Sequence, residues 1–179
     1  AHFVSRKAMN ADGLGERWLE QLLEKGLIKQ SADLYGLSAE KILSANIEGM
    51  GEKLADNIIT AITKTKQTTL QRFIYALGIR GVGEGTSLAL AQYFGTLEAI
   101  ISADEEALKQ VPDIGEVSAK WIVDYFSQEI HRQQLAQFIA AGVTWPVIDI
   151  EQAQHQPLVG QSWVLTGTLS SLGRDAAKA

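Results

Sequence analysis

The sequence predicts an all-α protein built from four helix–turn–helix units, followed by a short α/β tail. Three observations support this prediction. A Gly-apolar-Gly step or a close variant of it occurs four times, apolar residues recur with helical spacing after each step, and no convincing strand pattern appears before about residue 142. The second glycines of the steps lie at intervals of 36, 32 and 32 residues, at Gly15, Gly51, Gly83 and Gly115.

Each step is followed by a predicted helix of about three turns. The apolar positions that mark these helices are Leu19, Leu22 and Leu23; Leu54, Ala55, Ile58, Ile59 and Ile62; Leu88, Leu90, Ala91 and Phe94; and Ala119, Ile122, Val123 and Phe126. Gly26 and Gly95 stand where left-handed residues commonly end helices.

Further helices are predicted between these units. Residues 70–77 form an apolar helical pattern that Gly78 ends, and Ser102–Glu105 has the spacing of a capping box. Ser31 and Ser38 are the expected N-caps of two short helices.

The pattern changes near Trp145. Residues 146–160 have the composition of a linker, with Pro146, Pro157 and Gly160. Residues 161–179 hold one plausible buried strand, Trp163–Gly167, and we expect this tail to be disordered because one strand cannot bury its own apolar surface.

Composition excludes several classes of protein. The chain has 179 residues, is 46% hydrophobic and contains no cysteine, which excludes disulfides, thiol nucleophiles and thiolate zinc sites. No window approaches eighteen apolar residues and no signal peptide is visible, so neither a membrane protein nor a secreted protein is expected. No catalytic constellation and no metal-ligand spacing are found, and the three histidines, His2, His131 and His155, lie far apart.

The glycine steps also have a chemical interpretation. The first N–H groups of a helix lack intrahelical partners and attract anions, and glycines before the helix let a phosphate approach the backbone. One such turn is usually only a tight connection, but four at regular spacing favour phosphate contact. Leu14, Met50, Val82 and Ile114, between the glycines, are expected to anchor the turns in the core.

The candidate phosphate contacts are therefore the turn glycines and the basic residues near them: Gly13, Gly15, Gly49, Gly51, Gly81, Gly83 and Gly115, with Arg17, Lys53, Arg80 and Lys120. The fourth turn is expected to be the weakest contact, because Asp113 replaces its first glycine. Glu52, Glu84 and Glu116 oppose an anion unless they point aside. Trp18, Trp121, Tyr93 and Phe94 are interpreted as core residues.

The net charge of −5 argues against a nucleic-acid partner, but the excess of acid is local. Residues 1–67 hold nine basic and nine acidic side chains, whereas residues 68–179 hold seven and twelve. A local anion site is therefore compatible with the composition.

The four turns resemble helix-hairpin-helix modules, and longer segments are similar to the C-terminal half of bacterial NAD-dependent DNA ligases. The segments are His2–Asn10 with Asp12–Gly15, Arg72–Arg80 with Val82–Glu84, and Val111–Gly115; Val164–Gly167 with Leu169 and Arg174 resembles the start of a BRCT domain. Ala11 and Gly81 depart from the usual pattern, in which larger residues stand at both positions.

The resemblance implies a division of the chain and a role for it. Residues 1–12 would follow a zinc finger, 13–145 would form four DNA-binding helix-hairpin-helix repeats, and 161–179 would begin a BRCT domain. The parent enzyme would seal nicks in duplex DNA with NAD, magnesium and zinc, in the bacterial cytoplasm. This segment would be non-catalytic, bind no cofactor, act as a monomer, and contact nicked double-stranded DNA and the other ligase domains.

Two alternatives remain at this point. The chain could be a helix-hairpin-helix module of a nuclease or branch-migration protein, although the opening segment and the BRCT-like tail argue against this. It could also be a protein-interaction scaffold, which its negative charge favours.

Overall fold

A computed structural model describes residues 1–148, and within this range the fold is entirely helical, as predicted. No strand occurs among the described residues, where the one β-type pairing is an isolated parallel bridge between Gln67 and Thr144. The predicted BRCT-like tail, residues 161–179, and most of the predicted linker lie outside the described residues.

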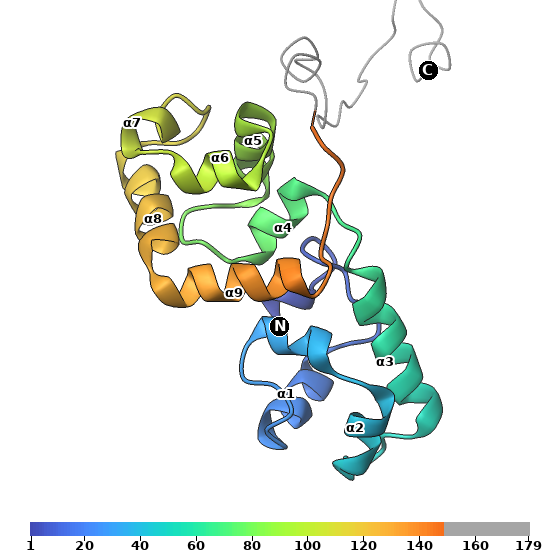
Figure 1. Cartoon of the computed structure of the whole chain (residues 1–179). Helices are drawn as coiled ribbons and strands as arrows, with labels where there is room; N and C mark the ends of the chain where they lie inside the picture. Colours follow the sequence, from blue (N-terminus) through green and yellow to red (C-terminus); the bar gives the residue numbers. More distant parts are fainter. Residues whose placement is uncertain (149–179) are drawn as a thin grey trace, which may run out of the picture.

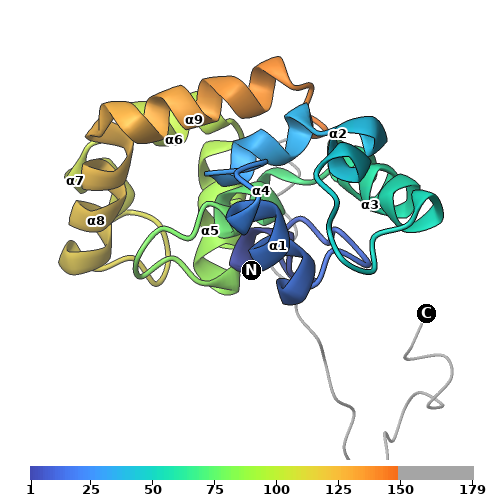
Figure 2. The same ribbon diagram turned by 90° about the horizontal axis from the view of Figure 1, so that it is seen from below.

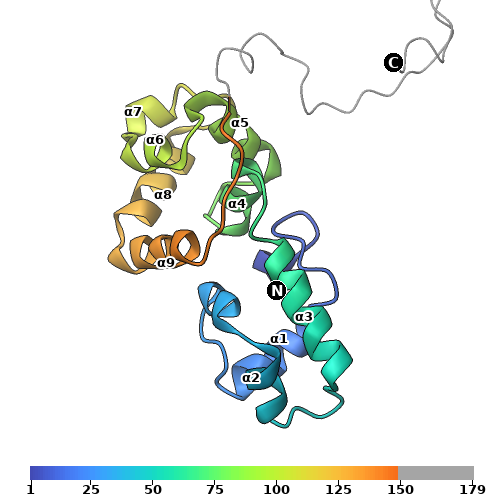
Figure 3. The same ribbon diagram turned by 45° about the vertical axis from the view of Figure 1, so that its right-hand side comes forward.

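The helices form two halves that lie one above the other in Figures 1 and 3. The first half contains α1 (Glu16–Glu24), the 3-10 helix η2 (Ser31–Gly36), α2 (Ala39–Ser44) and α3 (Glu52–Lys64). The second half contains α4 (Leu70–Ala76), α5 (Glu84–Phe94), α6 (Leu97–Ser102), α7 (Glu105–Leu108), α8 (Glu116–Ser127) and α9 (Glu129–Ala140).

Each half encloses its own hydrophobic core, and each core is built over two of the four glycine turns. Leu22, Ile42 and Ile58 are among the fully buried side chains of the first core. Phe73, Leu90 and Ile122 are among the fully buried side chains of the second core. The repeat found in the sequence is therefore organised as two pairs of hairpins.

The N-terminal segment packs between the halves. It starts with a short 3-10 helix, His2–Val4, and Val4 belongs to the first core whereas Ala8 and Met9 belong to the second. The Arg72 side chain of α4 secures it, because Nε donates a hydrogen bond to the Ala8 carbonyl at 2.8 Å and Nη2 donates to the Arg6 carbonyl. Residues 1–12 are thus part of the folded unit.

The helix ends confirm some predictions and correct two. Ser38 caps α2, and Gly26, Gly78 and Gly95 have left-handed backbones, as expected. The prediction for Ser31 was wrong: Gln30 is the N-cap of η2, and the Asp33 carboxylate accepts hydrogen bonds from the Gln30 and Lys29 amides. The prediction for Ser102 was also wrong.

Ser102 ends α6, and Asp104 caps α7 by accepting a hydrogen bond from the Ala107 amide at 2.8 Å. A carboxylate two residues later thus provides the cap, since a short side chain at the N-cap reaches the third amide of its helix.

One predicted core position is also exposed, because Leu23 on α1 has half of its surface in solvent. Among residues 1–148, no helix is long and apolar enough to cross a membrane.

Candidate nucleic-acid interface

The four glycine turns share one backbone geometry. In each turn the amide of the central apolar residue donates a hydrogen bond to the carbonyl of the apolar residue three positions earlier. The donor and acceptor pairs, at 3.0–3.2 Å, are Leu14 and Ala11, Met50 and Ile47, Val82 and Ile79, and Ile114 and Val111. The residue before the donor has a positive φ of 84° at Gly13, 78° at Gly49, 75° at Gly81 and 64° at Asp113. Asp113 therefore preserves the left-handed backbone of the glycine that it replaces.

The residue between each pair anchors its turn, as predicted. Leu14, Val82 and Ile114 are buried, and Met50 is half-buried against the first core. The flanking residues at all four turns are exposed. Each turn therefore holds its backbone at the surface by inserting one side chain into the core.

The second glycine of each turn is the N-cap of the helix that follows. Gly15, Gly51, Gly83 and Gly115 have extended backbones and begin α1, α3, α5 and α8, and no side chain of residues 1–148 caps the first amides of these helices. By contrast, side chains cap α2, α4, α6 and α7, through Ser38, Thr69, Thr96 and Asp104. The helices that follow the glycine turns are thus left open at their positive ends.

These open helix starts lie on one side of the molecule. Figure 2 shows the segments that lead into α1, α3, α5 and α8 on the side opposite α9, with those before α5 and α8 next to each other. A Cβ at Gly15, Gly51, Gly83 or Gly115 would meet no atom within 4 Å. The space at the Cβ position of each of these four glycines is therefore unoccupied by other parts of residues 1–148.

All predicted basic residues are exposed, but the structure places them differently with respect to the turns. Arg17 lies beside the turn of the other hairpin in its half, since its Nη2 would be 3.8 Å from a Cβ at Gly49. Arg80 belongs to its own turn, whereas Lys53 and Lys120 lie on α3 and α8. None of the four pairs with a carboxylate within residues 1–148.

A glutamate is the first residue of every hairpin helix, at positions 16, 52, 84 and 116. An acid at this position interacts favourably with the helix dipole. One of these charges is also neutralised, because Glu84 lies 2.9 Å from Lys7 Nζ and the hydrogen bond and charge of Glu84 raise the pKa of Lys7. The acids thus stabilise helix starts as well as opposing an anion.

The interpretation of the aromatic residues as core is confirmed for Trp18 and Phe94, which pack against the first and the second core, and was wrong for Tyr93 and Trp121, which belong to neither. Trp18 and Trp121 are half-buried and each lies under an arginine, and Tyr93 is 40% exposed. Helical spacing gave the helix correctly, but it did not distinguish the edge of the buried face from its centre.

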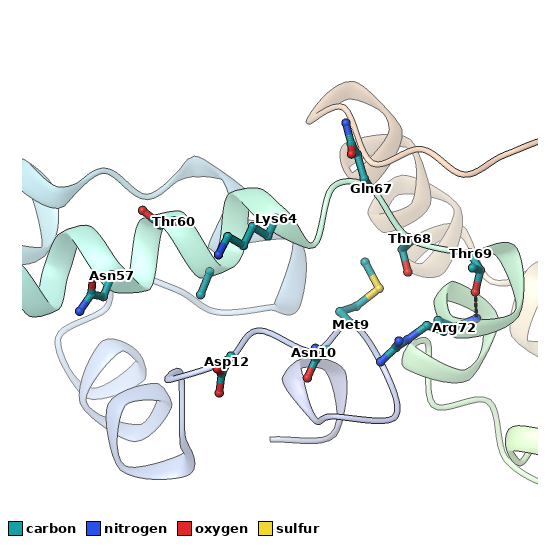
Figure 4. A pocket seen from close by; sticks show the side chains of 11 residues that line it. Met9, Asn10, Asp12, Asn57, Thr60, Lys64, Gln67, Thr68, Thr69 and Arg72 are labelled. Carbon is teal, nitrogen blue, oxygen red and sulfur yellow. Dashed lines mark hydrogen bonds between the residues drawn. The ribbon is translucent and has the colours of Figure 1, made fainter.

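A polar cleft of about 580 Å³ adjoins the first turn and was missed by sequence reasoning. It lies between α3, the N-terminal segment and the start of α4, and Figure 4 shows Lys64, Asn10 and Arg72 around it. A second hollow shares Asn10 with this cleft and includes Arg6 and the Gly13–Gly15 turn. Asn10, which lines both hollows, has a positive φ of 55°, a backbone conformation that asparagine tolerates better than most residues.

Comparison with known families supports the division into two pairs of hairpins. Residues 5–64 match a family model described as a SAM-like helix-hairpin-helix tandem. Residues 72–135 match a helix-hairpin-helix motif model. The two matches correspond to the two cores and together contain all four turns.

Curated relatives at about 50% identity are DNA ligases. The chain is 49% identical over 178 residues to a DNA ligase of Alkalilimnicola ehrlichii, and 51% and 52% identical over 177 residues to those of Acinetobacter baylyi and Acinetobacter baumannii. These matches cover 98–99% of this chain and 26% of each relative. The chain therefore spans about a quarter of the length of the curated relatives that it matches.

Proposed function

We propose that this chain is a helix-hairpin-helix segment of a larger DNA ligase, corresponding to about a quarter of the length of such an enzyme. In this proposal the segment holds duplex DNA for the larger enzyme without recognising the DNA sequence. The observation that carries the proposal is the set of four glycine-capped helix starts on one side of the molecule. Amide groups at such positions bind phosphate oxygens, which occur at every nucleotide and carry no sequence information.

Local charge supports this arrangement in a chain whose net charge is negative. Arg17, Lys53, Arg80 and Lys120 are exposed near the turns and have no acidic partner within residues 1–148. Backbone amides add positive potential without adding formal charge. The predicted contacts at the seven turn glycines and four basic residues thus form part of this proposal.

The activity of the longer protein belongs to the same proposal. We assign it the sealing of nicks in duplex DNA, with NAD, magnesium and zinc held outside this segment. Within residues 1–148 no group of three or more metal-ligating side chains occurs. The segment would act as a monomer in the bacterial cytoplasm and supply grip on nicked DNA during replication and repair.

Fluorescence anisotropy with labelled nicked and intact duplexes, at a low and a high salt concentration, tests the proposal. We expect salt-dependent binding to both duplexes, since phosphate neutralisation releases counterions and a single nick removes few phosphate contacts. Binding that does not respond to salt, or no binding, would contradict the proposal and favour a protein-interaction scaffold.

The Gly83→Asp variant identifies the surface responsible. An aspartate is a good N-cap, so α5 should gain stability, while the carboxylate occupies the amides and repels phosphate. Affinity should fall about tenfold, which corresponds to about 1.4 kcal/mol. Gly51→Asp should behave similarly for α3.

Gln128→Asp is the matched control, because it adds the same charge at the N-cap of α9, which lies on the opposite side of the molecule. Its affinity should stay within about twofold of the original chain. Equal losses in Gly83→Asp and Gln128→Asp would show that net charge, and not the hairpin amides, determines binding.

A further inference from the structure

Each half contains a tryptophan that packs against the left-handed glycine of a turn. A Cβ at Gly81 would lie 2.7 Å from Cε3 and 2.9 Å from Cζ3 of Trp121. A Cβ at Gly49 would lie 3.7 Å from Cη2 of Trp18. In both halves the indole comes from the other hairpin of the pair, so it bridges two turns.

Each of these indoles also lies beneath an arginine. The Arg80 guanidinium carbon is 4.4 Å from the Trp121 ring centroid, and the Arg17 carbon is 4.9 Å from the Trp18 centroid. Both arginines are exposed, whereas both tryptophans are half-buried. A guanidinium on an aromatic face is attracted by the ring and loses part of its rotational freedom before it meets a ligand.

The two arrangements are built from different sequence positions. In the first half the arginine and the tryptophan are neighbours on α1, whereas in the second half Arg80 precedes α5 and Trp121 lies on α8. The same trio of left-handed glycine, indole and guanidinium thus arises twice without a shared sequence pattern. Two independent routes to one arrangement indicate that it has a role at the surface that carries the turns.

We propose that Trp18 and Trp121 are positioning residues that hold Arg17 and Arg80 ready for DNA phosphates and fix the spacing of the two turns in each half. This inference rests on the proposed function and extends it to residues that contact the arginines. An arginine held in a fixed plane can present two parallel N–H groups to a phosphate, so preorganisation improves its contact.

The close approach at Gly81 makes this glycine and Trp121 mutually dependent. A larger side chain at position 81 would collide with this indole, because even its Cβ would come within 3 Å of the ring. The missing side chain at position 81 therefore provides the space that Trp121 uses to reach Arg80.

DNA binding by Trp121→Leu, Trp121→Phe and Arg80→Gln in the 179-residue chain tests the role of Trp121. Trp121→Leu keeps the Arg80 charge but removes the aromatic face, and its affinity should fall about threefold to tenfold. Trp121→Phe should recover most of this loss. Adding Trp121→Leu to Arg80→Gln should cause little further loss, because the indole acts through the arginine.

Tyr93→Leu is the matched control, since Tyr93 is an exposed aromatic residue on α5 that packs on Phe94, and among residues 1–148 no arginine lies on its ring. Its affinity should be unchanged. Circular dichroism establishes that each variant remains helical. Wild-type affinity in Trp121→Leu, or full additivity with Arg80→Gln, would overturn the inference.

Two measurements without DNA separate this inference from the proposed function. The NMR resonance of the Arg80 Nε–H should show a ring-current shift in the wild type and in Trp121→Phe, and lose it in Trp121→Leu. Gly81→Ala should lower the thermal midpoint more in the wild type than in the Trp121→Ala background, where the collision with the indole is absent. The cost of placing alanine at a positive φ is the same in both backgrounds and cancels in the comparison. If these results hold and the wild type fails to bind DNA, the proposed function is wrong; if they fail, the positioning role is wrong.

Discussion

The ring of Phe3 stacks on that of Phe138, with centroids 5.1 Å apart and planes within 10° of each other. Tyr35 and Phe73 present T-shaped contacts to Phe138, and Phe73 stacks on Trp145 at 4.9 Å. Because Tyr35 belongs to the first half and the other partners of Phe138 to the N-terminal segment and the second half, this aromatic cluster joins the two cores.

Phe138→Ala is therefore expected to destabilise the whole protein. Phe138 is 1% exposed, and truncation of such a ring costs about 3–5 kcal/mol. Urea denaturation followed by circular dichroism measures the loss. Ile139→Ala is the control: its side chain is 48% exposed, and the change should stay within about 0.5 kcal/mol. Similar losses in the two variants would contradict the assigned role.

Arg72→Met should release the N-terminal segment. The guanidinium holds the carbonyls of Ala8 and Arg6, and without it the backbone near Arg6 and Lys7 should open more often. Limited trypsin digestion with mass spectrometry should show cleavage after these residues several-fold faster. In Arg132→Met, which removes an exposed α9 side chain bonded to the Ser127 carbonyl, the cleavage rate should be unchanged.

Asp113→Gly should strengthen DNA binding if the four turns contact phosphates. The substitution keeps the left-handed backbone and removes a negative charge from the fourth turn. We expect an affinity gain of about twofold to fivefold, measured by anisotropy. Asp113→Asn should give most of this gain, since asparagine also tolerates positive φ. No gain in either variant would mean that this turn does not approach DNA.

The Asp33 carboxylate should contribute stability at neutral pH and lose it in acid. Burial raises its pKa, but hydrogen bonds from the Lys29 and Gln30 amides and the Gln30 side chain outweigh this, so the pKa lies below its ordinary value of 3.8. A lowered folded pKa gives stability that is present above 3.8 and is lost as pH falls through the folded value.

Asp33→Asn should therefore cost about 1 kcal/mol at neutral pH, and the difference from the wild type should disappear at a pH below the folded pKa. Thermal denaturation across the acidic range measures this convergence. Asp124→Asn, at an exposed position of α8, should follow the wild-type curve. A constant deficit at all pH values would indicate that the carboxylate charge is not involved.

Tyr125 should ionise unusually late. Burial raises the pKa of Tyr125 to about 12, and the His131 ring stacks on its ring at 3.8 Å. Because the folded pKa is raised, the neutral phenol contributes stability below its ordinary pKa of 10.0, and this contribution is lost as pH rises toward 12. Burial also raises the pKa of Tyr35, so phenolate absorbance should show a late component from both residues, and Tyr125→Phe should remove the share that belongs to Tyr125.

The turns were predictable because their geometry depends on local backbone chemistry. Glycine adopts positive φ without strain, so Gly13, Gly49 and Gly81 mark left-handed positions, and the apolar residue after each marks the anchor. Asp113 could be placed at the same position only because the repeat supplied the alignment. Local rules thus predicted three turns directly and the fourth by analogy.

The joining of the halves was not predictable from local rules. Phe3, Tyr35 and Phe138 are distant in sequence, and no periodicity indicates that their rings meet. The arginine-bearing sides of Trp18 and Trp121 were missed for a related reason: a helical pattern gives the direction of a face but not what covers it. The cap at Ser102 was misplaced because Asp104 competes for the same turn.

The bridge between Gln67 and Thr144 has a consequence for the order of folding. The Thr144 amide donates to the Lys66 carbonyl at 2.7 Å, and the Thr68 amide donates to the Thr144 carbonyl at 3.1 Å. The chain thus leaves the first half and returns to the same point, so the second half is a loop tied at its base. The entropy lost on closing a loop must be offset by contacts made across it, and hairpins form from near neighbours. We therefore expect the helical hairpins to form early and this tie to close late, so that the second half is assembled before it is fastened to the first.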